Sequence, residues 1–238
     1  MRASVRVMTS AMAAMATITM VAGCGGAGSD AAAADTSPAG SDVTVPPKDL
    51  VLSGSELPRG YQEMPIPADQ MQKSADGMLD ATRGADISPA ACAPPSAIPD
   101  TMDMSEMGML VAALGSTTLA EVVTADHGDM TAIRKSMTGD CEKVTAAIKN
   151  GDAAGSSSTI VNTPMDVPDS RADDVFAVKQ TSTSTVNGRE VTATSLLGWA
   201  TVGGYSVAVT SGGLLGAPDA VVFNTTLVKA IDKVATAG

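Results

Sequence analysis

The sequence predicts an α+β domain in which an antiparallel β-sheet is covered by helices and closed by a C-terminal helix. Segments rich in Thr and Val lie on either side of Asn187-Gly188 and of Gly203-Gly204, and both pairs are typical of two-residue hairpin turns. Residues 218–236 then carry an apolar stripe at helical spacing. Since a sheet must bury its apolar faces under another layer, this order of elements favours helices packed on a sheet.

The C-terminal half is expected to be a three-stranded meander, with strands at 175–186, 190–202 and 205–210. Counting outward from Asn187-Gly188 places Val178 opposite Leu197 and Phe176 opposite Trp199. Counting from Gly203-Gly204 places a second apolar set on the other face: Leu196, Ala200, Val202, Tyr205, Val207 and Val209. Both faces of the meander are therefore apolar, and we expect a helix on each.

The remaining elements are predicted from shorter patterns. A helix is expected over 127–138, with Asp126 as its N-cap, and a shorter helix over 68–82. Further strands are expected at 61–66, 118–124, 142–148 and 159–165, and residues 88–100 with their four prolines read as a loop.

The N-terminus resembles a bacterial export signal. Arg2 and Arg6 precede an uncharged stretch over 7–20, and small residues lead to Cys24. The segment Val21-Ala22-Gly23-Cys24 resembles a lipobox. This resemblance implies a lipoprotein signal peptide over residues 1–23, cleavage before Cys24, and an acylated (for example palmitoylated) Cys24 that holds the chain in the lipid bilayer.

Residues 24–47 are expected to form the lipidated cysteine and a flexible spacer, because Gly, Ala, Ser and Pro dominate this stretch. Residues 48–238 are long enough for a single α+β extracytoplasmic domain. Cys92 and Cys141 are the cysteines left in that domain, and in an exported protein they most simply form a disulfide. Closing this loop would stabilise the fold by roughly 4 kcal/mol in the chain-entropy model.

Charge and residue content exclude several classes of function. The net charge is −11 and the chain has no basic run, so nucleic acid is not an expected partner. One histidine, His127, is present, flanked by Asp126 and Asp129 at the expected start of a helix. A hydrolase using His127 as a base is one alternative, but no nucleophile motif accompanies it. We therefore expect no enzyme activity and no cofactor.

Methionines concentrate at one place in the sequence, with Met102, Met104, Met107 and Met109 inside eight residues. Thioethers bind Cu(I), so a copper-handling protein using this cluster is a second alternative. Methionine also fills irregular apolar space and lines adaptable pockets, which favours core or ligand contacts. If the stretch is helical, Met102 shares a face with Met109, and Met104 with Met107.

The whole layout resembles mycobacterial or related actinobacterial cell-envelope lipoproteins. The segment 57–61, Leu-Pro-Arg-Gly-Tyr, is similar to the opening of small lipoproteins with an uncharacterised domain, and 89–92 to the Pro-x-x-Cys that follows in them. The general plan is similar to the extracellular sensor domain of the mycobacterial Ser/Thr kinase PknH, although that domain has two disulfides. The resemblance implies a sensor-like domain on the outer face of the cell membrane that binds a small apolar or cell-wall ligand, or an envelope protein.

Overall fold

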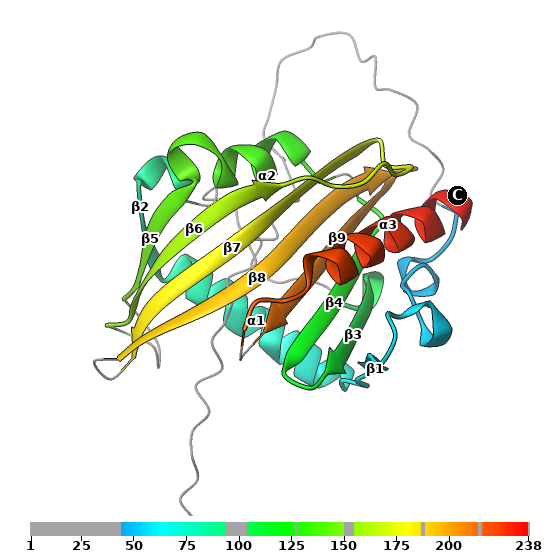
Figure 1. The fold of residues 1–238 in the computed structure, drawn as a ribbon, viewed down its shortest axis with the longest axis horizontal. Helices are drawn as coiled ribbons and strands as arrows, with labels where there is room; N and C mark the ends of the chain where they lie inside the picture. The colour runs from blue at the N-terminus through cyan, green and yellow to red at the C-terminus, as the bar shows by residue number, and fades with distance from the viewer. Residues whose placement is uncertain are drawn as a thin grey trace, which may run out of the picture.

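The computed structural model describes residues 44–93, 104–126, 128–149, 155–186, 189–213 and 216–237. Within these residues, nine strands pair into one antiparallel sheet in the order β1-β3-β4-β9-β8-β7-β6-β5-β2 (Figure 1). The strands are β1 (Gln62–Glu63), β2 (Ala85–Ser88), β3 (Gly108–Leu114), β4 (Thr117–Thr124), β5 (Lys143–Ile148), β6 (Ser157–Met165), β7 (Asp174–Val186), β8 (Arg189–Val202) and β9 (Tyr205–Gly213). The helices are α1 (Ala68–Arg83), α2 (Met130–Met137) and α3 (Ala220–Ala237). The predicted α+β class with a closing C-terminal helix is confirmed, and most of the domain is sheet.

The predicted register of the C-terminal meander is confirmed. Phe176 pairs with Trp199 and Val178 with Leu197 across β7 and β8. The rings of Phe176 and Trp199 lie 6.3 Å apart, centroid to centroid, in a stacked arrangement. Strand β9 continues to Gly213, further than the sequence predicts, because β4 pairs along its whole length.

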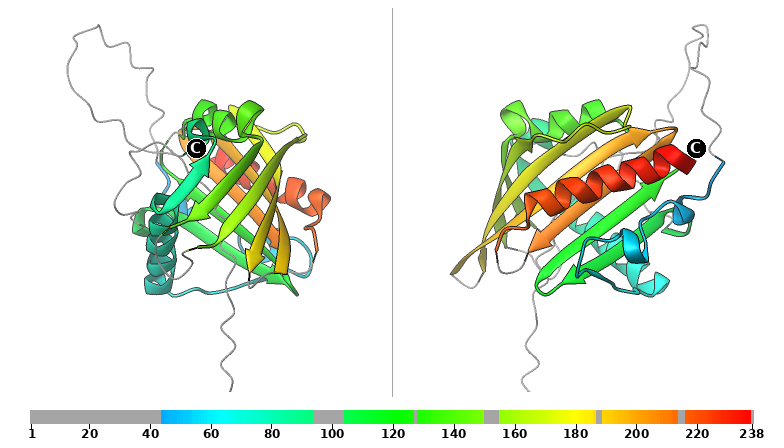
Figure 2. Two further views of the ribbon diagram at one scale, coloured as in Figure 1. Left: turned by 90° about the vertical axis from the view of Figure 1, so that its left-hand side faces the viewer. Right: turned by 45° about the vertical axis from the view of Figure 1, so that its right-hand side comes forward.

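A helix covers each face of the meander, as expected. Helix α3 packs on one face, where Phe223, Leu227 and Ile231 are fully buried against the apolar residues of β8 and β9. Helix α2 covers the other face, where Met130, Ile133 and Met137 contact the Phe176 and Trp199 pair and its neighbours. Figure 2 shows the sheet between α3 on one side and α1 with α2 on the other.

Helix α1 lies between the two edge strands in the sequence, because β1 precedes it and β2 follows it. Its 16 residues span roughly 24 Å at the usual helical rise. The helix therefore crosses the side of the sheet opposite to α3 and connects its two edges (Figures 1 and 2). This side, which we call the α1 face, contains the candidate site.

Several local predictions are wrong. Helix α2 begins at Met130, and its N-cap is Asp129, whose carboxylate accepts a hydrogen bond from the backbone N–H of Ala132 (2.9 Å). Asp126 is not the cap. The strand expected at 61–66 has two paired residues, β1, because the chain leaves the sheet edge toward α1. Strands β2 and β3 were not predicted.

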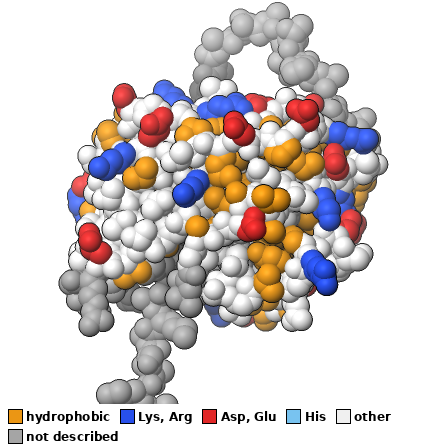
Figure 3. All heavy atoms as spheres, in the orientation of Figure 1, with side chains coloured by type: hydrophobic (Ala, Val, Ile, Leu, Met, Phe, Trp, Pro, Cys, Tyr) orange, Lys and Arg blue, Asp and Glu red, His pale blue; other side chains and the backbone are white. Residues whose placement is uncertain are grey.

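The outer surface mixes both signs of charge. On the face that carries α3, acidic and basic side chains are scattered, with apolar side chains between them (Figure 3). The large apolar side chains most exposed among the described residues are Met64, Leu114, Val161 and Val221. Along the described parts of the chain, no helix has both the length and the apolar character needed to cross a membrane.

Candidate functional site

A hollow of about 150 Å³ opens on the α1 face, between α1 and the edge of the sheet. Three methionines from three different elements line it: Met64 just after β1, Met71 on α1, and Met109 on β3. The rest of the lining is Glu63, Pro65, Ile66, Leu110 and Val111. The hollow is therefore a methionine-rich recess in which backbone polar atoms and one carboxylate are exposed beside the apolar side chains.

Local structure explains why these side chains meet. Pro67 precedes α1, so the chain between β1 and the helix cannot continue as strand or begin the helix earlier. Residues 64–66 therefore leave the sheet edge just before α1 and bring Met64 beside Met71 in the lining. On β3, alternation along the strand directs Met109 and Val111 to the α1 face and Leu110 toward α3.

The methionine cluster expected at 102–109 is arranged differently from the prediction. Met104 lies in a 3-10 turn (Met104–Glu106), Met107 follows it, and β3 begins at Gly108. Met102 lies outside the described residues. Because Met109 belongs to a strand, the stretch is not one helix, and the shared face expected for Met102 and Met109 in a helix does not apply. The structure brings Met109 to Met64 and Met71, which the sequence pattern did not associate with it.

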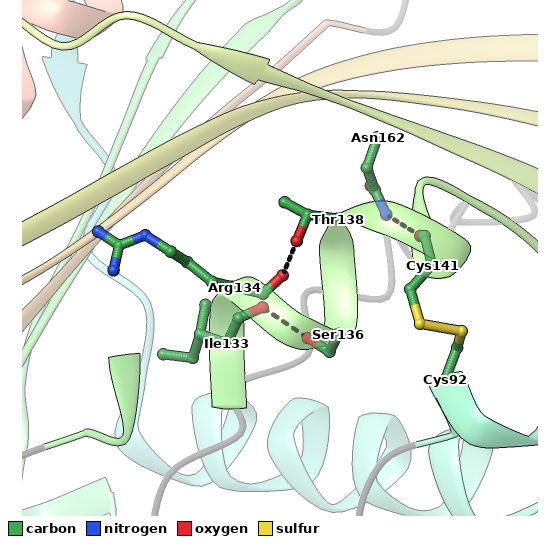
Figure 4. Close-up of a disulfide and its surroundings, with 7 residues drawn as sticks. All are labelled: Cys92, Ile133, Arg134, Ser136, Thr138, Cys141 and Asn162. Carbon is green, nitrogen blue, oxygen red and sulfur yellow. Dashed lines mark hydrogen bonds between the residues drawn. A yellow bond between two sulfur atoms is a disulfide. The ribbon is translucent and has the colours of Figure 1, made fainter. Parts of the chain in front are cut away.

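The predicted disulfide between Cys92 and Cys141 is present, with a Cα–Cα distance of 5.5 Å. It joins the 3-10 turns Ala90–Cys92 and Gly139–Cys141 at the end of α2 (Figure 4). Beside it, the side-chain amide of Asn162 donates to the Cys141 carbonyl (3.3 Å), and that of Gln180 donates to the Asn162 side-chain oxygen (3.0 Å). The adjacent hollow measures about 10 Å³, which is room for one water at most. This region is a small separate core, in which the disulfide packs with Ile87 of β2, Val144 and Ala146 of β5 and Ile160 of β6.

Helix α2 is also tied to the sheet by an ion pair. Arg134 donates to Asp174 (Nη1–Oδ2, 3.0 Å) and to the Val175 carbonyl (2.8 Å), and its guanidinium lies over the Phe176 ring, 5.3 Å from its centroid. The hydrogen bond from Arg134 lowers the pKa of the Asp174 carboxyl below its ordinary value. The ion pair positions α2 on the sheet. Because Arg134 and Asp174 bind each other, we do not include them in the candidate site.

Among the described residues, a carboxyl group is buried on the opposite face. Glu121 lies on β4 between Leu119 and Val123 and has no exposed surface. Its Oε2 accepts a hydrogen bond from the backbone N–H of Leu52 (2.9 Å), and its Oε1 has no hydrogen-bond partner. Burial raises the pKa of Glu121 to about 7, and the Leu52 hydrogen bond and the charge of Lys233 offset this only in part. Glu121 is not among the site residues expected from the sequence.

The described residues offer no other constellation for chemistry. His127 lies outside them, so its predicted surroundings are not described. Among the residues that are described, no group of three or more His, Cys, Asp or Glu side chains is placed to hold a metal ion. The methionine-lined hollow is therefore the candidate binding site.

No family model matches the chain, and no curated protein matches it. Among solved structures, an X-ray structure of an uncharacterised protein from Mycobacterium smegmatis, described as the Rv0999 ortholog, is similar to it with a TM-score of 0.41 and 15% sequence identity. The similarity covers 76% of this chain and 92% of that chain. The likeness is thus a remote one to an uncharacterised mycobacterial protein, and the function of this chain has to be argued from its own residues.

Proposed function

We propose that this chain is a lipoprotein of the cell envelope, anchored to the outer face of the cell membrane through acylated Cys24, with a binding domain that performs no chemistry. The lipobox-like segment that ends at Cys24 and the Gly- and Ala-rich stretch after it support the anchor and the spacer. The disulfide between Cys92 and Cys141 fits an oxidising compartment outside the cytoplasm.

The hollow on the α1 face is the observation that carries the binding function. Apolar side chains and exposed polar atoms share its lining, and Met64, Met71 and Met109 are unbranched side chains that adapt to the shape of a bound molecule. Ligand pockets for drug-sized molecules usually measure about 300–1,000 Å³. A hollow of about 150 Å³ therefore suits a small apolar molecule, or one end of a longer one such as a cell-wall lipid.

A sensor role is the finer form of this proposal. The similarity of the sequence plan to the PknH extracellular sensor domain favours a domain that reports a bound ligand to an envelope protein. The single disulfide Cys92–Cys141 departs from the two of that domain, so no contact residue is transferred from it.

Native mass spectrometry of the mature protein, purified from the envelope of its host, tests the binding function. We expect a retained small molecule in the wild-type protein. Met109→Gln places a polar amide in the hollow and should release this molecule. Met165→Gln is the matched control, because Met165 is also a half-buried strand methionine but lies outside the hollow. An empty wild-type protein, or equal retention by both variants, would reject the hollow as the site and direct the search to protein partners.

The same lining supports Cu(I) handling as a second candidate function. Three thioethers from Met64, Met71 and Met109 converge on one hollow, and soft sulfur ligands select Cu(I). This candidate set shares only Met109 with the set expected from the sequence, Met102 to Met109.

Anaerobic titration with Cu(I) against a chromophoric Cu(I) chelator tests this candidate. Replacing Met64, Met71 and Met109 together by Leu removes the thioethers at similar volume and should abolish binding. The control replaces Met104 and Met107 by Leu, and it should bind as the wild type does. Loss in the control alone would move the site to the 102–109 cluster, and no binding by the wild type would remove copper as a function.

A further inference from the structure

The residues that lead into the domain lie as a strap over the face of the sheet that carries α3. The strap, residues 45–57, contains the 3-10 turns Pro47–Asp49 and Gly54–Glu56. It runs beside α3 over β3 and β4 (Figure 2, right). Its leucines, Leu50, Leu52 and Leu57, are buried in the same core as α3. Residues 45–47, which the sequence assigns to the spacer, thus belong to the packed domain.

The strap contacts the sheet backbone directly at one place. A Cβ atom added to Gly108, the first residue of β3, would lie 2.1 Å from the Pro47 carbonyl oxygen and 2.9 Å from a Val51 methyl carbon. No side chain larger than hydrogen is compatible with a seated strap at this position. The start of the strap is held by Tyr205, whose hydroxyl donates to the Val45 carbonyl (2.9 Å) and accepts from the Val45 N–H (3.1 Å).

The middle of the strap covers the buried carboxyl of Glu121. The hydrogen bond from the Leu52 N–H is the one polar contact that the strap makes with this carboxyl. A carboxylate that is buried with one hydrogen bond is poorly stabilised, whereas the protonated acid is tolerated much better. Glu121 regains hydration only if the strap or its neighbours move away.

The charged groups around Glu121 do not neutralise it. From α3, Lys233 is already engaged: its Nζ donates to Glu56 Oε2 (2.6 Å) and to the Val51 carbonyl (2.7 Å). From the strap, Glu56 adds a second negative charge, which opposes ionisation of Glu121. The strands beside it contribute uncharged neighbours, Leu110 from β3 and Val209 from β9.

We propose that the strap is a pH-responsive closure, seated while Glu121 is protonated and released when Glu121 ionises. Release would uncover the apolar face of β3 and β4 beneath Leu50 and Leu52. If the chain is anchored at Cys24 as proposed above, release would also lengthen its connection to the membrane. The closure itself does not depend on that anchor or on the hollow of the α1 face.

Hydrogen exchange of the Leu52 amide measures this closure. The pKa of Glu121 is about 7 with the strap seated, and an ordinary Glu has a pKa of about 4.5. Because Glu121 ionises more readily when the strap is open, the equilibrium constant for opening the strap rises about 70-fold from pH 5 to pH 8. The exchange rate of the Leu52 amide, corrected for its intrinsic rate at each pH, should rise by the same factor. The Leu227 amide, in the core of α3, is the reference for global unfolding.

Two variants separate the closure from other effects of pH. Glu121→Gln keeps an oxygen to accept from Leu52 but cannot ionise, so its exchange at Leu52 should stay constant from pH 5 to pH 8. Gly108→Ala displaces the strap at Pro47, so exchange should be fast at every pH. A pH-independent rate in the wild type, or a 70-fold rise that persists in Glu121→Gln, would overturn the proposal. Equal exchange at Leu52 and Leu227 at every pH would overturn it as well, because the strap would then open only with the whole domain.

Discussion

Gly198→Ala tests how closely α3 approaches the sheet. A Cβ at position 198 on β8 would lie 2.7 Å from Leu227 Cδ2 and 3.0 Å from Phe223 Cζ. Carbon atoms in good contact are about 3.5–4.0 Å apart, so the helix and the strand would have to separate by about 1 Å. Leu227 and Phe223 are fully buried, so each can move only by displacing its own neighbours.

The expected loss follows from this overlap. Overpacking of a core costs about 1–3 kcal/mol, and we expect about 2 kcal/mol here because both neighbours are side-chain ends that can adjust in part. For a domain of this size, that corresponds to a fall in Tm of about 4–8 °C. Urea denaturation followed by circular dichroism measures the loss.

A double-mutant cycle assigns the loss to this contact. Leu227→Ala alone leaves a cavity and costs about 2–5 kcal/mol. With Gly198→Ala present, the new methyl group enters that cavity, so the double variant should be more stable than the sum of the two single losses by about 1 kcal/mol. The control is Gly77→Ala on α1, where a Cβ meets no atom within 4 Å. It should stabilise the protein by about 0.5–1 kcal/mol, because alanine favours a helix. A neutral Gly198→Ala, or strict additivity with Leu227→Ala, would refute the close seating of α3.

Other predictions concern the far side of the sheet. Replacing Cys92 and Cys141 by Ser should lower the free energy of unfolding in urea by up to about 4 kcal/mol, and an unchanged midpoint would contradict a stabilising crosslink. Asp129→Ala removes the N-cap of α2 and should cost about 1 kcal/mol in the same assay, whereas Asp126→Ala should be much milder. The ion pair with Arg134 lowers the pKa of Asp174. The pair therefore contributes fully to the free energy of unfolding above the ordinary carboxyl pKa of about 4, and this contribution is lost as the pH falls through the lowered pKa of Asp174. Asp174→Asn should therefore destabilise the protein at pH 7, and this loss should shrink as the pH falls through the lowered pKa of Asp174, which thermal unfolding over a series of pH values measures.

The C-terminal meander could be predicted in detail because the turns that determine its strand pairing lie between strands that are consecutive in the sequence. Two-residue turns fix the register, and the register then decides which side chains share a face. This was sufficient to pair Phe176 with Trp199 and to require a helix on both faces. The pairing of β4 with β9 joins strands far apart in the sequence, and no turn between them could indicate it.

Strand β3 was not predicted because the apolar residues around it fit the spacing of a helix as well as that of a strand. Met102 and Met109 lie seven residues apart and favour a helix, whereas the run from Gly108 to Leu114 is also a short apolar strand. In the structure, all seven residues of β3 pair with β4 across the two-residue turn Gly115-Ser116, which was not among the turns predicted from the sequence. The hollow could not be predicted because Met64 and Met71 meet Met109 only after β1 pairs with β3, which is remote in sequence.

A signal for Glu121 was present in the sequence. Leu119 and Val123 lie two residues before and after Glu121 on β4, so Glu121 falls between them on the buried face. A charged residue at an apolar position of a strand indicates a group that must be buried, paired or functional. Its partner, a backbone N–H of the strap, carries no side-chain signal and became apparent only in the structure.

The path of α1 between the two edges of the sheet has a consequence for the order of folding. The local hairpins of β7, β8 and β9 can form as soon as those residues are made, whereas β1 must wait for β3, and β2 for β5. Synthesis proceeds from the N-terminus, so the residues made first are among the last to find their strands. Until then both borders of the growing sheet have unpaired backbone groups, which are the groups through which two chains can associate. Attachment of the short strands β1 and β2 at the end of folding ends this exposure, and α1 then holds both in place with one segment of chain.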